Sequence, residues 1–335
     1  MTRSTSGGRR AVVVGAGIAG LTCALRLQRD GWRVRIIADR APRASTSWRA
    51  AAVWFPTLAA PRERVLDWGT RTYAELADQA RRGVPGALMR ESLALYPDPP
   101  EQPWWAGAAG GVRPARPDEL PPGYRHGLRF VVPLAEMPSY LPWLRAEYER
   151  AGGRIERRRL GSLAGAAGGA AGGAAGGAAG GADLLVNCTG LGARSLVGDA
   201  SVVPVRGQVV RVHNPGLTLS VRDEYHPAGR AYVHPRGDDC VLGGTLEEDR
   251  WDEEPDPEVA ASILRRCRDL APALAGAEVL EHVVGLRPAR PAVRLEAEPA
   301  TGGGPPVIHN YGHGGSGITL CWGCADDVAA LAARL

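Results

Sequence analysis

The sequence contains no lysine, since all 40 of its basic residues are arginine. This absence excludes mechanisms that need a lysine Schiff base, an amine base or the phosphate-binding lysine of a Walker motif. With 36 acidic residues the formal net charge is only +4, and the arginines are scattered, so nucleic-acid binding is not expected. No run of 18 strongly apolar residues occurs, and we therefore expect no membrane-spanning segment.

Cysteine is sparse and spread out, with six residues in 335. This distribution differs from the dense framework of a small disulfide-stabilised protein. Cys321 and Cys324 form a C-x-x-C pair, but no second pair accompanies them, as a zinc site would require. We expect structural thiols in or near a helix and no metal site.

Glycine, in contrast, is in excess, with 45 copies. Much of the surplus lies in 161–182, where residues 166–181 are four copies of Ala-Ala-Gly-Gly. Glycine-rich repeats behave as flexible coil, so we predict an expanded surface loop over 161–182.

Hydrophobic patterning predicts a strand, a glycine turn, a helix and a second strand over residues 11–39. Apart from a helix near 62–80, residues 56–128 are rich in proline and are predicted to be mostly loop. Further helices are expected at 138–153, 256–271 and 319–335, and strands at 154–160, 184–187, 208–212, 231–234, 241–243 and 307–308.

The turn after the first strand reads Gly15-Ala16-Gly17-Ile18-Ala19-Gly20, which fits a dinucleotide-binding fingerprint. Its first glycine makes the tight turn, its second lets the backbone approach a pyrophosphate, and its third lets helix and strand pack closely. The positive end of the following helix favours the phosphates. Asp39 ends the second strand, where a carboxylate can bind the ribose hydroxyls. The sequence therefore predicts a dinucleotide cofactor.

Four further stretches carry a family resemblance, and they lie at 45–56, 185–193, 285–291 and 309–319. The last three read LVNCTGLGA, GLRPARP and HNYGHGGSGIT. Together with the fingerprint, they resemble the D-amino-acid oxidase family, including its D-aspartate oxidase branch. The resemblance implies non-covalent FAD and hydride transfer from Cα of a D-amino acid to flavin N5. The imino acid then hydrolyses to a 2-oxo acid and ammonia, and O2 reoxidises the flavin to give hydrogen peroxide.

The fold that the resemblance implies is α/β, with a Rossmann-like FAD-binding domain and a substrate domain built on a mixed, largely antiparallel sheet. We assign 1–56, 138–200 and 286–335 to the FAD-binding domain, and 57–137 and 201–285 to the substrate domain.

The resemblance also implies roles for single residues. Arg287 and Tyr232 would bind the substrate carboxylate, and the carbonyl of Gly315 would accept the substrate amine. Phe55 would form an apolar pocket wall, and Tyr225 could replace a lid tyrosine that has no clear counterpart. The residues expected to bind FAD are Gly15, Ala16, Gly17, Ile18, Ala19, Gly20, Asp39, Arg40, Thr46, Ser47, Ala52, Val53, Cys188, Thr189, Gly190, Arg294, Gly314, Ser316, Gly317, Ile318 and Thr319.

We expect a cytoplasmic enzyme, as a homodimer, acting on neutral and apolar D-amino acids. D-Aspartate oxidation is an alternative, which would need a further pocket cation such as Arg222 or Arg230. A glycine- or sarcosine-type amine oxidase and a flavin-bound module without turnover are two further hypotheses. His309 and His313 lie in a glycine-rich turn and are expected to have structural polar roles.

Overall fold

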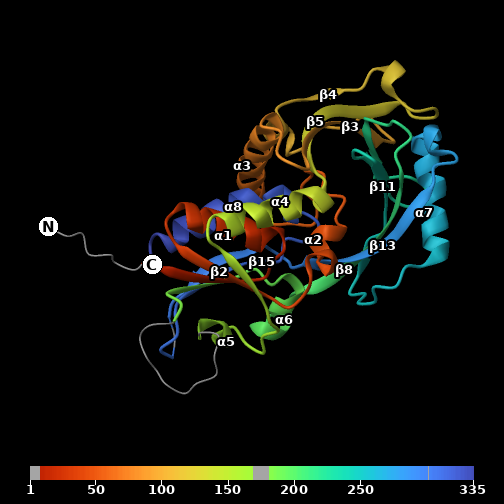
Figure 1. Cartoon of the computed structure of the whole chain (residues 1–335). Helices are drawn as coiled ribbons and strands as arrows, with labels where there is room; N and C mark the ends of the chain where they lie inside the picture. The colour runs from red at the N-terminus through yellow and green to blue at the C-terminus, as the bar shows by residue number, and fades with distance from the viewer. Residues whose placement is uncertain (1–7, 169–180, 301) are drawn as a thin grey trace.

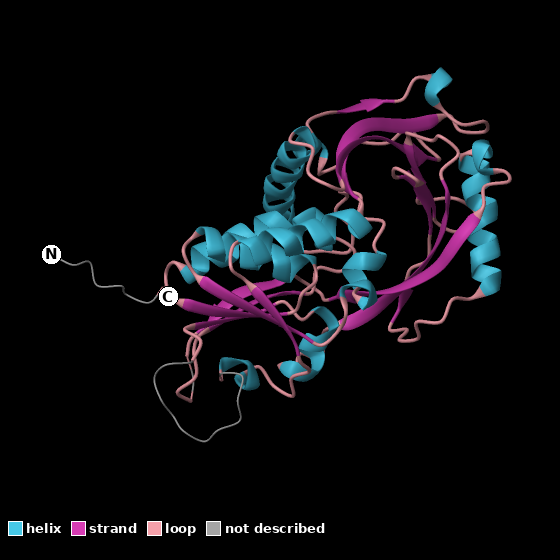
Figure 2. Cartoon of the chain, in the orientation of Figure 1, coloured by secondary structure: helices cyan, strands magenta, loops and turns pink. Residues whose placement is uncertain are grey.

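Two β-sheets organise the residues that this computed structural model describes, which are 8–168, 181–300 and 302–335 (Figure 2). Within them the first sheet has six strands in the order β14-β15-β7-β1-β2-β6, and only the β14–β15 pair is antiparallel. Its strands are β1 (Arg10–Val14), β2 (Arg33–Ala38), β6 (Arg154–Arg157), β7 (Leu184–Asn187), β14 (Arg294–Glu298) and β15 (Val307–Tyr311).

Both faces of this sheet are covered, as parallel strands require. Along β1 the side chains alternate between the faces, so that Ala11 and Val13 join the core beneath four helices. Val12 and Val14 pack on the other face with Leu163. The four helices are α1 (Ile18–Arg29), α3 (Arg62–Arg81), α4 (Met137–Arg150) and α8 (Gly317–Ala332), and Figure 1 shows α1, α4 and α8 above the sheet.

The second sheet has nine strands in the described residues and is antiparallel except for the β3–β9 pair. Its path is β12-β8-β11-β10-β9-β3-β5-β4, with β13 also paired to β8. The strands are β3 (Ala87–Tyr96), β4 (Val112–Pro114), β5 (His126–Ala135), β8 (Val203–His213), β9 (Ser220–Asp223), β10 (Ala231–Pro235), β11 (Asp239–Gly243), β12 (Glu247–Glu248) and β13 (Val279–Ala289). The predicted fold class is therefore confirmed.

Helix α7 (Pro257–Leu270) covers the second sheet (Figure 1). Asp256 caps it by accepting the N–H of Glu258 at 2.8 Å, and Pro272 follows its end. Its buried side chains Ile263 and Cys267 pack in one cluster with strand residues such as Val210. The remaining helical segments are short: α2 (Thr46–Arg49), α5 (Ala164–Ala167), α6 (Ala193–Leu196), η1 (Pro42–Ala44), η2 (Ala106–Ala109), η3 (Pro117–Glu119), η4 (Gly190–Gly192) and η5 (Pro272–Leu274).

The expectation of mostly loop over 56–128 is wrong, because β3 lies in this region and pairs with β5 over ten residues. Strand β13 was also missed, and its first four residues are exposed. A strand with an exposed end and no regular alternation gives a weak periodic signal.

The strands of the first sheet come from the segments assigned to the FAD-binding domain, although the expected boundary at 286 falls within β13. Helix α3, which was assigned to the substrate domain, packs instead in the core of the first sheet through Val65 and Trp68. The Trp68 indole N–H donates to Asp327 of α8 at 2.7 Å. The domain division stays a prediction.

The predicted loop 161–182 begins with ordered packing. Residues Ala164–Ala167 form α5, and Ala166 is buried against the first sheet with Leu163. Residues 169–180 of the loop lie outside the described residues. No helix among the described residues is long and apolar enough to cross a membrane.

Candidate functional site

The predicted cofactor-binding segments meet at one edge of the first sheet. Strands β1, β2, β7 and β15 are parallel, so their carboxyl ends share this edge. The glycine turn, Asp39, the Cys188–Gly190 segment and the glycine cluster at 312–317 each follow one of these ends. Ligands of open parallel sheets bind at this edge.

The glycine turn has the steric features of a dinucleotide cradle. Gly15 has φ +110°, and a β-carbon there would overlap the Cys188 carbonyl. A β-carbon on Gly20 would overlap the Gly15 carbonyl, whereas one on Gly17 would have Ser47 Oγ at 3.1 Å as its nearest neighbour. Helix α1 then begins at Ile18, whose N–H donates to Ser47 Oγ, while Gly17 has no side chain to cap the other N–H groups of the first turn. These features leave room and a positive helix end for a pyrophosphate.

Other predicted cofactor residues surround this turn. Asp39 and Arg40 are exposed after β2, and Arg40 Nη1 lies 3.5 Å from Glu253. Ser47 Oγ accepts the Ile18 N–H at 3.0 Å, and Thr46 Oγ1 donates to the Leu286 carbonyl at 2.9 Å. These bonds join α2 to the turn and to β13.

The segments after α2 and β7 complete this edge. Ala52 has φ +57° and accepts the Ala135 N–H at 2.9 Å, and Val53 pairs with Leu134. Cys188 Sγ lies 3.9 Å from Cys23 Sγ, and that contact and burial raise the pKa of Cys188. Thr189 Oγ1 donates to Asn187 at 2.7 Å, and Gly190 has φ +56°.

The glycine cluster opens a second helix, α8, toward the same edge. Gly314 donates its N–H to Pro288 at 2.8 Å, and its φ of +54° brings it against the Leu58 carbonyl, where a β-carbon would overlap. The N-cap Ser316 provides no side-chain cap, so the positive end of α8, with Gly317 and Ile318, is open to a ligand.

The hydroxyls of Ser316 and Thr319 bind the protein backbone. Ser316 Oγ accepts the Thr57 N–H at 2.7 Å and donates to the Thr57 carbonyl at 2.5 Å. Thr319 Oγ1 makes the same pair of bonds to Phe55, at 3.0 and 3.1 Å. These two side chains therefore fix the 55–57 segment against α8 and are not directed toward a ligand.

Three residues predicted to bind substrate come together where the two sheets meet. Tyr232 on β10 is close enough to Arg287 on β13 for the guanidinium to oppose the rise in its pKa that burial causes. A β-carbon on Gly315 would lie 3.8 Å from Arg287 Cδ. Within the described residues, Arg287 has no carboxylate partner and donates only to the Thr245 carbonyl, at 3.2 Å. It is therefore available to an anion.

Two glycines that sequence reasoning missed make room for this pair. A β-carbon on Gly207 of β8 would overlap the Arg287 guanidinium, and one on Gly243 of β11 would overlap the Tyr232 ring. A glycine inside a strand often marks such a close approach, and this signal could have identified both.

Phe55 packs against Trp105, and the Arg222 guanidinium lies over its ring. Trp105 meets its ring edge-on at 5.1 Å, and Arg222 Cζ lies 3.6 Å from its ring centre. Arg222 is 9 % exposed, its Nη1 has no hydrogen-bond partner, and no carboxylate of the described residues pairs with it. Burial lowers the pKa of its guanidinium.

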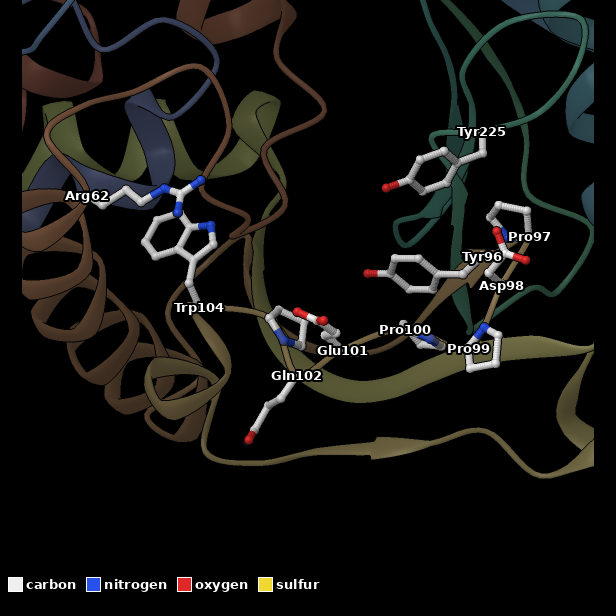
Figure 3. A pocket seen from close by; sticks show the side chains of 11 residues that line it. Arg62, Tyr96, Pro97, Asp98, Pro99, Pro100, Glu101, Gln102, Trp104 and Tyr225 are labelled. Carbon is white, nitrogen blue, oxygen red and sulfur yellow. The ribbon is translucent and has the colours of Figure 1, made fainter.

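Arg294 and Tyr225 make their contacts with residues other than the cofactor turn and the Arg287–Tyr232 pair. Arg294 lies on β14, separated from β1 by β15 and β7, and binds Glu296 at 2.7 Å and the Tyr311 hydroxyl at 2.8 Å. Tyr225 is 60 % exposed and its ring lies 5.9 Å from Tyr96. Figure 3 shows both tyrosines across an open pocket from Arg62 and Trp104.

His309 and His313 are both buried in polar contacts, but only His313 lies in the glycine-rich turn, since His309 is on β15. His309 Nδ1 lies 3.1 Å from Asn187 Nδ2, and His313 Nε2 donates to Asn310 Oδ1 at 2.9 Å. Burial lowers the pKa of His313 to about 4, so its ring is neutral near pH 7. Cys321 and Cys324 are both buried within α8.

Comparison with known proteins agrees with this geometry. A family model described as FAD dependent oxidoreductase matches residues 10–331. A D-amino-acid oxidase of Rubrobacter xylanophilus is 52% identical over 324 residues, which cover 96% of this chain and 95% of that protein. A D-amino-acid oxidase of Streptomyces coelicolor is 44% identical, with 96% of each chain covered, and human D-aspartate oxidase is 36% identical, with 96% and 94% covered.

Among solved structures, glycine oxidase from Geobacillus kaustophilus aligns with a TM-score of 0.76 at 20% identity, covering 97% of this chain and 95% of that one. At this identity the likeness shows the fold. The glycine cradle and the two open helix ends fit FAD, and the predicted cofactor is confirmed. The chain belongs to the FAD-dependent oxidoreductase family, in which its relatives include the D-amino-acid oxidases.

Proposed function

We propose that this chain, an FAD-dependent oxidase of D-amino acids, binds the substrate carboxylate between Arg287 and Tyr232. One observation carries this proposal: Arg287 has no carboxylate partner among the described residues and stands beside Tyr232 and Gly315. A guanidinium fork matches a carboxylate in bidentate geometry. The Tyr232 hydroxyl would donate a further bond, and burial raises its pKa, so it stays protonated as a donor. The Gly315 carbonyl would accept the substrate amine.

The chain's contribution to the reaction is mainly orientation. FAD, when bound, supplies the two-electron acceptor, and O2 reoxidises it to give hydrogen peroxide. Arg287, Tyr232 and Gly315 would hold the carboxylate and the amine of the substrate. With these two groups held, the direction of the Cα–H bond is fixed. No side chain near Arg287 needs to act as a general base for this step, which agrees with the absence of lysine.

The cofactor would lie along the edge formed by β1, β7 and β15. Its pyrophosphate would face the turn Gly15–Gly20 and the first turn of α1, and Asp39 would bind ribose hydroxyls. The positive end of α8 at Gly317 would face the flavin ring, where negative charge develops on reduction. Thr46, Ser47, Ala52 and Val53 would position the flavin from the 46–53 segment.

Neutral D-amino acids fit the pocket through its apolar wall. Phe55 packs with Trp105, and Trp105 also contacts Trp54 and Phe130. A neutral side chain placed on this wall would bury apolar surface, which contributes about 25 cal/mol per Å².

Acidic D-amino acids are a second candidate class, and Arg222 is the observation that favours them. A buried guanidinium without a carboxylate is strongly disfavoured, and a substrate carboxylate would compensate it. Its position over Phe55 places the charge on the wall that faces the substrate side chain.

A peroxide-release assay over D-methionine, D-phenylalanine, D-aspartate and D-glutamate tests both classes. Replacing Arg222 with methionine should lower kcat/KM for D-aspartate and D-glutamate by about tenfold or more and leave D-methionine nearly unchanged. Arg268→Met is the control, because Arg268 is exposed in the last turn of α7. Equal turnover of D-aspartate by wild type and Arg222→Met would refute the role of Arg222.

The same assay tests for a glycine- or sarcosine-type amine oxidase and for a flavin-bound module without turnover. Turnover of sarcosine or glycine without turnover of any D-amino acid would overturn the proposal. A flavin that stays oxidised during anaerobic mixing with D-amino acids would indicate a module without turnover. The homodimer and the cytoplasmic location stay predictions.

A further inference from the structure

His234 lies in the second sheet on the same face as the two residues proposed to contact substrate. It follows Tyr232 by two positions on β10, so both side chains point to one face. Arg222 is paired directly opposite Tyr232 on the antiparallel neighbour β9. Ser220 stands two residues before Arg222 and completes a group of four on this face.

The contacts of His234 connect the whole group. Its ring stacks on Tyr232 with the centres 4.6 Å apart and the planes 15° from parallel. Its Nδ1 lies 2.6 Å from Ser220 Oγ, and its Nε2 lies 3.5 Å from Arg222 Nη2. Among the described residues, no other side chain makes a hydrogen bond or a ring contact to Tyr232 and also to Arg222.

The charge state of His234 is fixed by its surroundings. The ring is buried, and burial together with the Arg222 charge lowers its pKa well below the usual value. Arg222 can only donate, so Nε2 must be the accepting nitrogen and Nδ1 carries the proton toward Ser220 Oγ. Among the described residues no carboxylate hydrogen-bonds the Arg222 guanidinium, although the charge of Glu224 is close enough to favour its charged form, so the group stays available to an anionic ligand.

We propose that His234 is a positioning residue that orients Tyr232 by stacking and Arg222 by accepting a hydrogen bond. His234 thereby influences both the binding of the substrate carboxylate and the selection of the substrate side chain. The inference rests on the proposed function, in which Tyr232 and Arg222 contact the substrate. His234 itself is 2 % exposed and would act on the substrate through these two side chains.

Two substitutions separate the two effects. His234→Phe keeps a flat ring for stacking on Tyr232 and removes the acceptor for Arg222. His234→Gln keeps an acceptor near Nε2 and removes the ring. His213→Phe is the control, because His213 is exposed at the end of β8. Flavin absorbance and the melting temperature show that each variant is folded and holds FAD.

The Phe variant should raise KM for D-aspartate by about fivefold while KM for D-methionine changes by less than about twofold, since one hydrogen bond is lost. The Gln variant should raise KM for both substrates by about fivefold, since Tyr232 loses its support. kcat should change less than KM in both variants. An unchanged KM, or one equal shift for both substrates in both variants, would overturn the proposal.

A double-mutant cycle with Arg222→Met distinguishes this inference from the proposed function. If His234 acts on D-aspartate through Arg222, the effect of His234→Phe should vanish in the Arg222→Met background. Additive effects would overturn the positioning role. If Arg222→Met alone has no effect on D-aspartate, the acidic-substrate proposal fails, and the D-methionine arm of His234→Gln still decides whether His234 supports Tyr232.

Discussion

Replacing Gly207 with alanine tests the carboxylate clamp without altering any residue of the clamp. The new β-carbon would overlap Nη1, Nη2 and Cζ of Arg287, so the guanidinium must move by more than about 1 Å to restore van der Waals contact. A charged hydrogen bond contributes about 1.5–3 kcal/mol, and its loss corresponds to about a 10- to 150-fold fall in kcat/KM. Most of the change should appear in KM, because Arg287 is proposed to bind the carboxylate.

The variant should otherwise be intact. Gly207 lies within β8 outside the positive-φ region, and the end of the Arg287 side chain is flexible, so the melting temperature and flavin absorbance should stay close to wild type. Gly107→Ala is the matched control, since a β-carbon there meets nothing within 4 Å. Steady-state kinetics with D-methionine measure the effect. A Gly207→Ala enzyme with the kcat/KM of Gly107→Ala would refute the placement of the clamp at Gly207.

Three further predictions concern the clamp, the glycine cluster and the repeat. Arg287→Ala should raise KM for every D-amino acid by at least about tenfold, and a near-normal KM in steady-state assays would disprove its role. Since burial lowers the pKa of His313 to about 4 from 6.5, the neutral ring contributes stability that is fully present above pH 6.5 and is lost as the pH falls toward 4. Between pH 7 and 4, the free energy of unfolding measured in urea should fall by about 3 kcal/mol less for His313→Gln than for wild type. An equal fall in the two proteins would contradict this. Shortening the repeat to its first Ala-Ala-Gly-Gly copy keeps the buried Ala166. Activity should be unchanged, because loop length contributes little to stability, and loss of bound FAD would disprove this.

The first βαβ unit could be predicted from sequence because its constraints are local. Gly20 lies against the Gly15 carbonyl within the same turn, and the spacing of the two glycines records that contact directly. The strand expected at 184–187 agrees with the structure, whereas the helix begins at Ile18, inside the glycine turn and three residues before the expected Leu21. Steric contacts within one turn require glycine at fixed spacings, and such spacings can be recognised in the sequence.

The second sheet was harder to predict because its pairings are distant in sequence. Strand β9 lies between β10 and β3, and Ser92 of β3 pairs with Ser220 of β9. No local pattern records such a partner. The same reason hid Gly207, whose neighbour Arg287 is on another strand, and His234, whose role depends on Arg222 across the sheet.

The surroundings of the buried arginines indicate the candidate site without any sequence motif. Four arginines are buried among the described residues, and they differ in what surrounds the guanidinium. Arg206 pairs with Glu247 at 2.9 Å, and Arg236 pairs with Asp239. Arg266 donates to the carbonyls of Arg230 and Ala228 at 3.0 and 3.2 Å.

Arg222 is the exception, since its Nη1 has no partner and the neutral ring of His234 is its acceptor. Removing a guanidinium from water has a free-energy cost of several kcal/mol, and the nearby charge of Glu224 offsets only part of it, since the pKa of Arg222 stays lowered. Such a site favours an anionic ligand, and the half-buried Arg287 on the same sheet likewise has no carboxylate partner among the described residues. Arg222 and Arg287 are two guanidinium groups on the second sheet that no carboxylate of the described residues hydrogen-bonds, which is the arrangement expected if the substrate carries two carboxylates.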